Sequence, residues 1–236
     1  MGDAVSLLVS LMIDFFNRKV VRTEDGSCSI YVSDLDEHYH SIHGAVQESK
    51  HVFIEMGWKK ATENKSEIKI LEIGFGTGLN LFLVRKELWK RKLKVHYTTI
   101  EAYPLTHEEA ESVNYYTEEG EQDSFLILHR AKWNEAVQLY PNDDFILEKI
   151  RITLEEFLPL PDQYDLIFFD AFSPDKQPEL WTAEIFRKMF VTMKPGGILV
   201  TYCAKGQVRR NLTAAGFSVE RLQGPPGKRE MLRATK

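Results

Sequence analysis

The chain has 236 residues, 43% of them apolar and 11% aromatic, which is enough for a sizeable core and excludes a globally disordered protein. A net charge of −5 does not indicate a dedicated nucleic-acid binder, but residues 201–236 contain eight Lys or Arg against two Glu. This basic end is compatible with local docking of phosphates and equally with a solvated surface. The two cysteines, Cys28 and Cys203, lack metal-ligand spacing, so we expect no disulfide, no zinc site and a reducing, cytoplasmic location.

The first residues do not predict a membrane or export segment. Residues 4–13 are apolar but too short to span a bilayer, and Asp3 stands where a signal peptide would carry Lys or Arg. We therefore expect an N-terminal helix or extra upstream residues, and no membrane contact. Residues 28–36 then have strand character, and the apolar spacing from Val46 to Met56 predicts a helix that stops at Gly57.

Strand and helix signals alternate through the rest of the chain and predict an α/β fold. Strands that are apolar on both faces and separated by helices indicate a mostly parallel sheet, here of seven strands, with covered faces. Two final strand-like runs with no helix between them predict an antiparallel hairpin at one edge. Strands are expected at 68–73, 95–100, 145–152, 166–169, 198–202, 217–222 and 230–234, and helices at 79–90, within 106–140, at 183–193 and at 207–215. We divide the chain into an N-terminal extension with a strand and helix segment, 1–57, and a main domain, 58–236.

The sequence LEIGFGTGLN, residues 71–80, places a glycine-rich loop after the first core strand. Gly74, Gly76 and Gly78 allow the backbone to touch a ligand without a Cβ clash. In parallel sheets, ligands bind outside the carboxyl ends of the strands, where this loop lies. The spacing G-x-G-x-G differs from the G-x-G-x-x-G of dinucleotide-binding loops, so the loop alone does not identify its ligand.

Acidic residues at the ends of successive strands narrow the ligand class. Glu72 would repel a diphosphate but could accept hydrogen bonds from an ammonium group, which suits the amino-acid end of S-adenosylmethionine. Glu101 ends the second strand, where acidic residues bind ribose hydroxyls in nucleotide folds. The plainer interpretation is a glycine turn with two surface glutamates, and we favour the cofactor.

Asp170 ends the fourth core strand and is the candidate catalytic group. If the methyl acceptor is an amine, a carboxylate within hydrogen-bond reach can orient it or take its proton. Without the neighbouring cofactor loop, we would interpret Asp170 as an acid that caps the end of a strand. His51 and Glu48, one turn apart on the preceding helix, are candidates for the acceptor pocket, although a lone His is more often structural. The histidines at 38, 40 and 43 match no metal site, so we predict no metal.

Five further segments extend these motifs into a family resemblance. LEIGFGTGLN, IEAYPLT (100–106), FFDAFSPDKQPELWT (168–182), KPGGILVTYCAKGQVRRNLTAAGF (194–217) and GPPGKREML (224–232) together resemble the methyltransferase domain of the MnmC-type tRNA modification enzymes. QESKHVFIE (47–55) resembles the family's segment upstream of the loop. The similarity covers roughly residues 22–236.

The resemblance implies a class I methyltransferase fold with S-adenosyl-L-methionine as the cofactor. It implies wobble 5-aminomethyl-(2-thio)uridine of tRNA as acceptor and the 5-methylaminomethyl base as product. In the fused bacterial form this domain is joined to an FAD-dependent oxidase domain. Nothing in the 236 residues matches that oxidase, so we expect a stand-alone methyltransferase, with upstream enzymes or a separate oxidase acting in sequence.

The family pattern carries over to individual positions. The adenine-binding acid has no direct counterpart, since the chain has Thr153, with Glu155 two residues later. Basic residues near the C-terminus would contact phosphates of the anticodon stem-loop, and Phe172 or Trp181 would stack on an extruded base. The predicted cofactor site comprises Glu72, Gly74, Phe75, Gly76, Thr77, Gly78, Asn80, Glu101, Ala102, Thr153 and Asp170; the predicted substrate site comprises His51, Glu48, Phe172, Lys205, Arg209, Arg210, Lys228 and Arg229.

Three other functions stay open on the sequence. A methyltransferase acting on a small molecule or another nucleic acid would use the same glycine loop. An aminopropyl transferase would too, although Glu72 is better used by a ligand that keeps its amino-acid end. A non-catalytic S-adenosylmethionine-binding protein is compatible with Thr153, although retention of Glu72, Glu101 and Asp170 as a set argues against a loss of activity.

Overall fold

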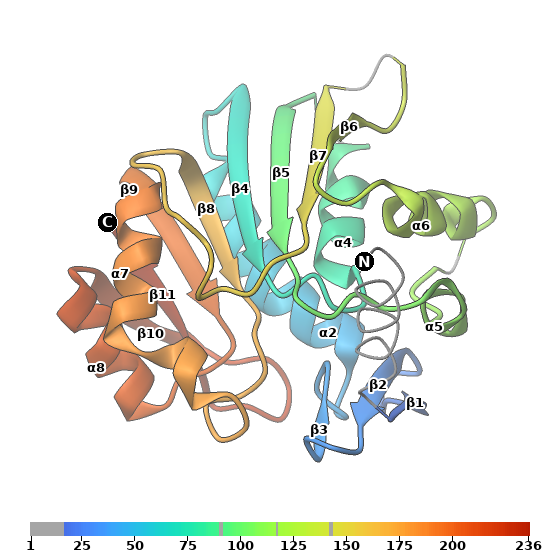
Figure 1. Cartoon of the computed structure of the whole chain (residues 1–236), viewed down its shortest axis with the longest axis horizontal. Coiled ribbons are helices and arrows are strands. Elements are labelled where there is room, and N and C mark those ends of the chain that lie inside the picture. Colours follow the sequence, from blue (N-terminus) through green and yellow to red (C-terminus); the bar gives the residue numbers. More distant parts are fainter. Residues whose placement is uncertain (1–16, 90–91, 117, 142–143) are drawn as a thin grey trace, which may run out of the picture.

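The computed structural model describes residues 17–89, 92–116, 118–141 and 144–236, so the helix expected at 4–13 lies outside the described residues. Its centre is an eight-stranded sheet (Figure 1). Five neighbouring strands, β9, β8, β4, β5 and β7, run parallel, which confirms the predicted fold class. The strand order is β10 (Ser218–Gln223), β11 (Glu230–Thr235), β9 (Met193–Thr201), β8 (Tyr164–Phe169), β4 (Glu67–Ile73), β5 (Lys94–Ile100), β7 (Phe145–Ile150) and β6 (Ala136–Gln138).

The sheet has one strand more than the seven predicted. The additional strand, β6, has three residues and pairs antiparallel with β7 at the edge of the sheet. Its residues are exposed or half-buried, so it lacks the apolar run that would announce it in the sequence. At the other edge, β11 is antiparallel to both β9 and β10, which confirms the predicted hairpin.

Residues 194–197, which separate the predicted helix at 183–193 from the predicted strand at 198–202, belong to strand β9 in the structure. The chain enters β9 directly at Met193, one residue after helix α7 (Ala183–Thr192) ends. Gly196 N donates to the carbonyl of Lys236 at 2.9 Å, and Lys236 N donates to the carbonyl of Gly197 at 3.1 Å. The β8–β9 register shifts here, so the two glycines form an irregularity inside the strand.

The two faces of the sheet carry separate apolar clusters because neighbouring residues of a strand point to opposite faces. Ile70, Phe168 and Val200 pack with the helical segment before β4 and with helices α4 (Leu79–Leu88) and α6 (Glu121–Arg130). Leu71 and Ile167 pack on the opposite face. This second face is covered by α7, by α8 (Gly206–Ala215) and by the short helix η2 (Pro178–Trp181).

The helical segment before β4 does not stop at Gly57 as predicted. Helices α2 (Ala45–Ser49), η1 (Lys50–Trp58) and α3 (Lys59–Ala61) follow one another without a break, and η1 has π-helical hydrogen bonding. A Cβ on Gly57 would lie 2.8 Å from Val200 Cγ2 and 3.2 Å from Phe168 Cε1. Gly57 therefore lets the helix approach the sheet closely. Because η1 crosses residue 57, the division of the chain at that position stays a prediction.

A second sheet stands at the edge to which β4 and β5 point (Figure 1). It contains β1 (Arg18–Arg22), β2 (Cys28–Val32) and β3 (Glu37–His38), all antiparallel, so the expected strand at 28–36 is shorter and has two partners. Helix α5 (His107–Ser112) lies between β5 and α6 in the chain. From β4 the chain continues to β5 and β7 on one side and to β8 and β9 on the other. The strand order reverses beside β4, where open α/β sheets bind ligands.

Filling Gly57 tests how closely η1 packs on the sheet. Gly57→Ala should lower the free energy of unfolding by about 1–3 kcal/mol, because Val200 and Phe168 are fully buried and cannot move aside. Urea unfolding monitored by circular dichroism measures the change. Gly206→Ala, in α8 near only the mobile end of Arg210, is the matched control and should be neutral or stabilising. Equal effects of the two substitutions would contradict the packing argument.

Candidate functional site

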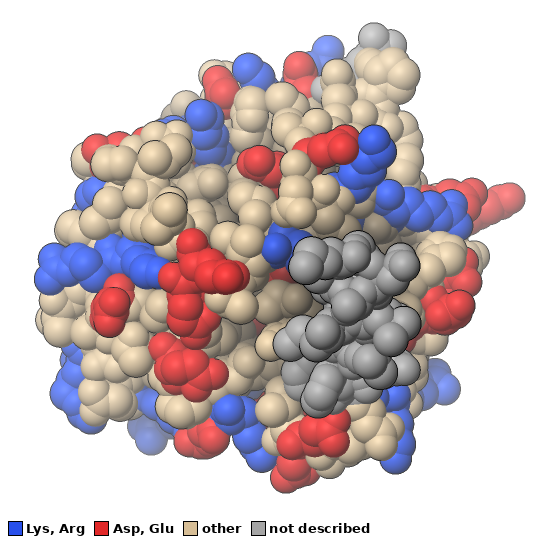
Figure 2. All heavy atoms as spheres, in the orientation of Figure 1, with Lys and Arg blue, Asp and Glu red and all other residues tan. Residues whose placement is uncertain are grey.

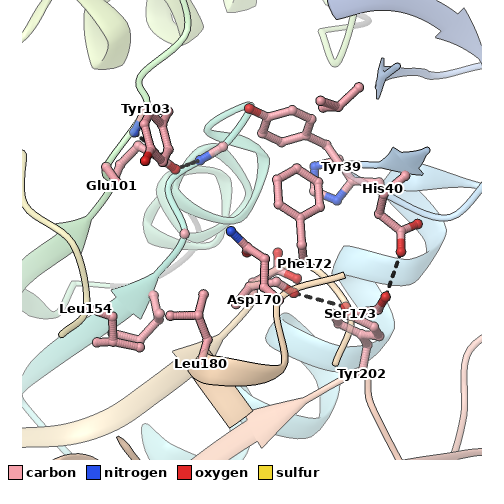
Figure 3. Close-up of a pocket in the computed structure, with 18 of the residues that line it drawn as sticks. Tyr39, His40, Glu101, Tyr103, Leu154, Asp170, Phe172, Ser173, Leu180 and Tyr202 are labelled. Atoms are coloured by element: carbon pink, nitrogen blue, oxygen red, sulfur yellow. Dashed lines mark hydrogen bonds between the residues drawn. The ribbon is translucent and has the colours of Figure 1, made fainter. Parts of the chain in front are cut away.

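A cavity of about 510 Å³ lies at the carboxyl ends of β4, β5 and β8. Its walls come from the glycine loop, the ends of these strands, the loop after β7, the loop after β8 and residues 37–42 of the small sheet. Figure 3 shows Glu101 and Tyr103 on one side of the cavity and Asp170, Ser173 and Tyr202 on another. The fold thus brings residues from distant parts of the chain to one site.

The glycine loop and Glu101 form the best-ordered part of the wall. Gly76 N donates to Glu101 Oε2 at 3.0 Å, and Tyr103 N donates to Glu101 Oε1 at 2.8 Å, so the carboxylate is held at the end of β5 (Figure 3). Gly76 has φ +50, and a Cβ there would lie 2.9 Å from Tyr39 Cδ1. Gly74, Gly76, Glu101 and Ala102 line the cavity as predicted for a cofactor site.

The remaining predicted loop residues support the loop from behind and do not line the cavity. Thr77 is fixed on two sides, because its hydroxyl lies 2.7 Å from His40 Nε2 and its carbonyl accepts from His129 Nε2 at 3.0 Å. Burial lowers the pKa of His40 and of His129 to about 4, so both rings are neutral at neutral pH. Phe75 packs against the rings of His129 and Trp133, and Gly78 begins α4 with φ +75.

Asp170 lines the cavity, whereas Glu72 does not. Asn80 Nδ2 donates to Asp170 Oδ2 at 2.8 Å, and burial raises the pKa of Asp170 to about 7. Glu72 is fully buried behind the wall, and burial raises its pKa to about 8. Glu72 is therefore mostly protonated at neutral pH, and direct contact with an ammonium group in the cavity stays a prediction.

The predicted acceptor residues divide into two groups. Glu48, Phe172 and Lys228 line the cavity, and Lys228 forms an ion pair with Glu48. His51 lies outside the lining, where its Nε2 is 2.8 Å from the carbonyl of Gln223. The other residues predicted to contact phosphate, apart from Lys228, are exposed and lie outside the cavity: Lys205, Arg209, Arg210 and Arg229. Lys205 forms an ion pair with Asp175, and Arg210 donates a hydrogen bond to Gln207.

The adenine position keeps both residues considered from the sequence. Thr153 and Glu155 line the cavity together with Ile152 and Leu154. The Thr153 hydroxyl already donates to Glu156 Oε2 at 3.2 Å. The carboxylate of Glu155 is therefore better placed than the Thr153 hydroxyl to accept a hydrogen bond from a ligand. Trp181 is buried and donates to the carbonyl of Phe172, which places it in the core.

No sequence pattern indicated the wall made by the small sheet. Tyr39 contacts Phe172 edge-on at 4.9 Å between ring centroids, and Ser173 donates to Glu37 at 2.7 Å (Figure 3). These contacts join β3 and the residue after it to the loop after β8. Glu37 and Ser173 are 136 residues apart in the chain. No local motif marks Tyr39 or Glu37. Tyr202 is the last residue of the predicted strand at 198–202, and this position at a strand end could have indicated that it lines the cavity.

The charge of the cavity decides which ligands fit. Its described lining contains six carboxylates and a single Lys or Arg, Lys228. A diphosphate would be repelled, whereas S-adenosyl-L-methionine carries a sulfonium and an ammonium group that suit acidic walls. The cavity borders Glu101 and the backbone of Gly74 and Gly76, where a ribose can lie, and Ile73, Ile100 and Leu154 add apolar surface. The residues present therefore fit that cofactor. The six carboxylates of the lining belong to Glu37, Glu48, Glu101, Glu155, Asp170 and Glu179.

No group of three or more His, Cys, Asp or Glu among the described residues is placed to hold a metal ion.

Comparison with known proteins agrees with this fit. Residues 126–236 match a family described as S-adenosyl-L-methionine-dependent methyltransferase. The match covers the C-terminal part of the chain, from α6 through β8, Asp170 and α8 to the last residue. It is 32% identical to the tRNA 5-methylaminomethyl-2-thiouridine biosynthesis bifunctional protein MnmC of Cupriavidus metallidurans, over 85% of this chain and 31% of that protein. It is 33% identical to the MnmC protein of Haemophilus ducreyi, over 84% of this chain and 32% of that protein. The chain thus spans about a third of the length of these relatives, and the predicted MnmC-type resemblance is confirmed.

Solved structures share the fold. The crystal structure of MNMC2 from Aquifex aeolicus has a TM-score of 0.77 and 27% identity, and covers 98% of this chain and 76% of that chain. Spermidine synthase from Thermotoga maritima has a TM-score of 0.53 with 12% identity, over 94% of this chain and 69% of that chain, and shows the fold alone. In the part of the protein that the structure describes, we find no helix with the length and apolarity needed to cross a membrane.

The buried carboxyl group of Glu72 predicts a pH-dependent stability. Its pKa rises from the usual 4.5 to about 8 on folding, so the folded protein binds more protons between these values and loses stability as pH rises through that window. Glu72→Gln should therefore raise the melting temperature by several degrees at pH 9 and by little at pH 5. Glu67→Gln, at the exposed start of the same strand, is the control and should change neither value appreciably. Equal stabilisation by Glu72→Gln at both pH values would contradict a buried ionisation.

Proposed function

We propose that the protein methylates the primary amine of wobble 5-aminomethyl-(2-thio)uridine in tRNA, giving 5-methylaminomethyl-(2-thio)uridine. The observation that carries the proposal is Asp170, a cavity-lining acid with a pKa near 7, in an acidic pocket that suits a cationic donor and an amine acceptor. The names of the MnmC relatives support tRNA over the other acceptors considered. Upstream enzymes or a separate oxidase would supply the aminomethyl base, and the cytoplasm is the proposed location.

Glu101 and the glycine loop would hold the cofactor. The two backbone N–H groups that fix Glu101 leave its carboxylate the remaining acceptor positions for ribose hydroxyls. Glu155 or Thr153 would receive the adenine amino group, between the apolar side chains of Ile152 and Leu154. When bound, S-adenosyl-L-methionine supplies the methyl group as an electrophile.

Asp170 would handle the proton of the acceptor. A primary amine attacks only as the neutral base. The new N–C bond forms as the S–C bond breaks, and the bond electrons stay with the sulfur. The methylated nitrogen is then positively charged and must release one proton. Asp170 can accept that proton because burial brings its pKa close to the working pH, and Asn80 fixes its orientation. The cavity walls exclude water and hold the reacting atoms in line.

The exposed basic side chains near α8 would contact the RNA backbone. In Figure 2, Lys and Arg side chains gather at the left edge of the molecule, over α7 and α8, with acidic side chains between them and the middle of the face. Arg209 and Arg210 are on the exposed side of α8, and Lys205 precedes it. A small basic footprint on an acidic protein predicts binding that weakens steeply with salt.

The main experiment is methylation of tRNA from cells that lack this activity, with labelled S-adenosyl-L-methionine and nucleoside analysis. Asp170→Asn should reduce methyl incorporation by at least about 100-fold and leave cofactor binding within about tenfold of the wild type. In the wild type, kcat/KM should rise with pH through about 7 as Asp170 loses its proton, and the variant should lack this step. Asp162→Asn, at a surface ion pair with Lys236, is the control. Full turnover by Asp170→Asn would remove Asp170 from the mechanism.

Charge reversal on α8 tests the RNA surface. Arg209→Glu combined with Arg210→Glu should weaken tRNA binding by about tenfold or more at low salt, without changing cofactor affinity. Arg130→Glu combined with Lys132→Glu makes the same charge change at the C-terminal end of α6, near the opposite edge of the sheet, and should have a much smaller effect. Filter binding over a salt series gives both the affinity and its salt slope. If the two double variants weaken binding alike, α8 is not the contact surface.

A further inference from the structure

The ion pair between Glu48 and Lys228 lies in the wall of the cavity. Glu48 is on α2 and Lys228 is in the hairpin between β10 and β11, so they are 180 residues apart in the chain. The Glu48 side chain is 7% exposed and the Lys228 side chain 31%. The Lys228 ammonium also lies 3.9 Å from the centroid of the Tyr202 ring. It is thus held between a carboxylate and an aromatic face.

This arrangement is a general binding site for an alkylammonium ion. A carboxylate supplies a charge-assisted hydrogen bond, and an aromatic face attracts a cation through its quadrupole. Tyr202 is fixed by its hydroxyl, which donates to the carbonyl of Ala171 at 2.9 Å, one residue after Asp170. Burial raises the pKa of Asp170, the Glu48 charge raises it further, and Lys228 lowers it, so the three charged groups act on one another. The position of the Lys228 ammonium therefore suits an amine that reacts beside Asp170.

We propose that Lys228 is a displaceable internal cation, whose place between Glu48 and Tyr202 is taken by the ammonium group of the acceptor base when that base enters the cavity. The inference rests on the proposed function and names how its acceptor is selected. In the free protein, Lys228 compensates the buried charge of Glu48. A base that carries no cationic substituent cannot replace Lys228 beside Glu48, so it leaves the ion pair in place and gains no affinity from this site, which disfavours unmodified uridine.

The surrounding structure allows the exchange by movement of one side chain. The hairpin backbone is fixed, because Gly224 N donates to Arg229 O at 3.1 Å, Lys228 N donates to Pro225 O at 2.9 Å, and a Cβ on Gly227 would lie 2.3 Å from the His43 ring. Glu48 is fixed as well, since Ser41 N donates to its second oxygen at 3.0 Å. The Lys228 stem is flexible and partly exposed, so its ammonium can swing out of the cavity while both partners stay.

The sequence prediction gave Lys228 a different task, a contact with RNA phosphate, and the two roles are separable by binding. The measurement uses two anticodon stem-loop RNAs that differ only in 5-aminomethyluridine or uridine at the wobble position, with S-adenosyl-L-homocysteine present to prevent turnover. Lys228→Met removes the competing cation and keeps a long side chain over Tyr202. It should bind the aminomethyl RNA about three- to tenfold more tightly and the uridine RNA within about twofold of the wild type.

Glu48→Gln should abolish the preference for the aminomethyl RNA by weakening that RNA alone, about tenfold. Arg229→Met is the matched control, because Arg229 is the next residue, is exposed and lies outside the cavity lining. It should change the affinity for both RNAs by one common factor. The double variant Glu48→Gln with Lys228→Met leaves no unpaired carboxylate, so it remains testable where Lys228→Met alone is unstable, and it should show no preference either.

Three outcomes overturn the inference. If Lys228→Met weakens both RNAs by the same factor, as Arg229→Met does, Lys228 contacts phosphate. If Lys228→Met leaves the ratio of the two affinities unchanged, or the double variant keeps the preference, Lys228 does not compete with the acceptor. A wild-type protein that binds both RNAs equally and does not methylate the aminomethyl RNA would instead remove the proposed function.

Discussion

The site depends on the close approach of two strand ends, β4 at Gly74 and β8 at Asp170. A Cβ on Gly74 would lie 2.6 Å from the carbonyl oxygen of Asp170, so no side chain fits between the two backbones. Gly74 N donates to Ile100 O and Asp170 N donates to Ile73 O, both at 3.0 Å, which continues the sheet pairing into the loops. This pairing places the glycine loop, Glu101 and Asp170 at one edge, where a donor and an acceptor can meet.

Charge is arranged differently inside and outside this edge. The cavity is acidic, which suits a sulfonium donor and an amine, while basic residues stand on the exposed surface of α8, where a phosphate backbone would lie. An RNA substrate would therefore leave its backbone on the surface and insert only a base. The acidic pocket would then select the base by its positive substituent. The Glu48–Lys228 pair makes this selection part of the protein's own charge balance, because the cavity already contains one ammonium group.

Burial sets the protonation of the groups around the cofactor loop. His40 and His129, which hold Thr77 from two sides, have pKa values of about 4 and stay neutral, so they position the loop without adding positive charge beside the donor. The pKa values of Asp170 and Glu72 are raised above that of a carboxyl group in water, whereas the pKa values of the two histidines are lowered. Both shifts follow from one cause, since a buried group loses the hydration of its charged form. Burial thus gives Asp170 a pKa that suits the proposed proton transfer, and it keeps Glu72 behind the cavity mostly neutral.

The sequence by itself determined the α/β fold, the order of the main strands and helices, and the positions of the glycine loop, Glu101 and Asp170. These features are local: apolar runs mark buried strands, glycines mark the loop, and acids at strand ends share an edge in any parallel sheet. Only the tertiary structure decided that Glu72 lies behind the cavity, that Gly57 continues a helix and that Lys228 pairs with Glu48. It also supplied Tyr39 and Glu37 as a wall. Each of these depends on a contact between segments far apart in the chain, and no pattern within one segment specifies its partner.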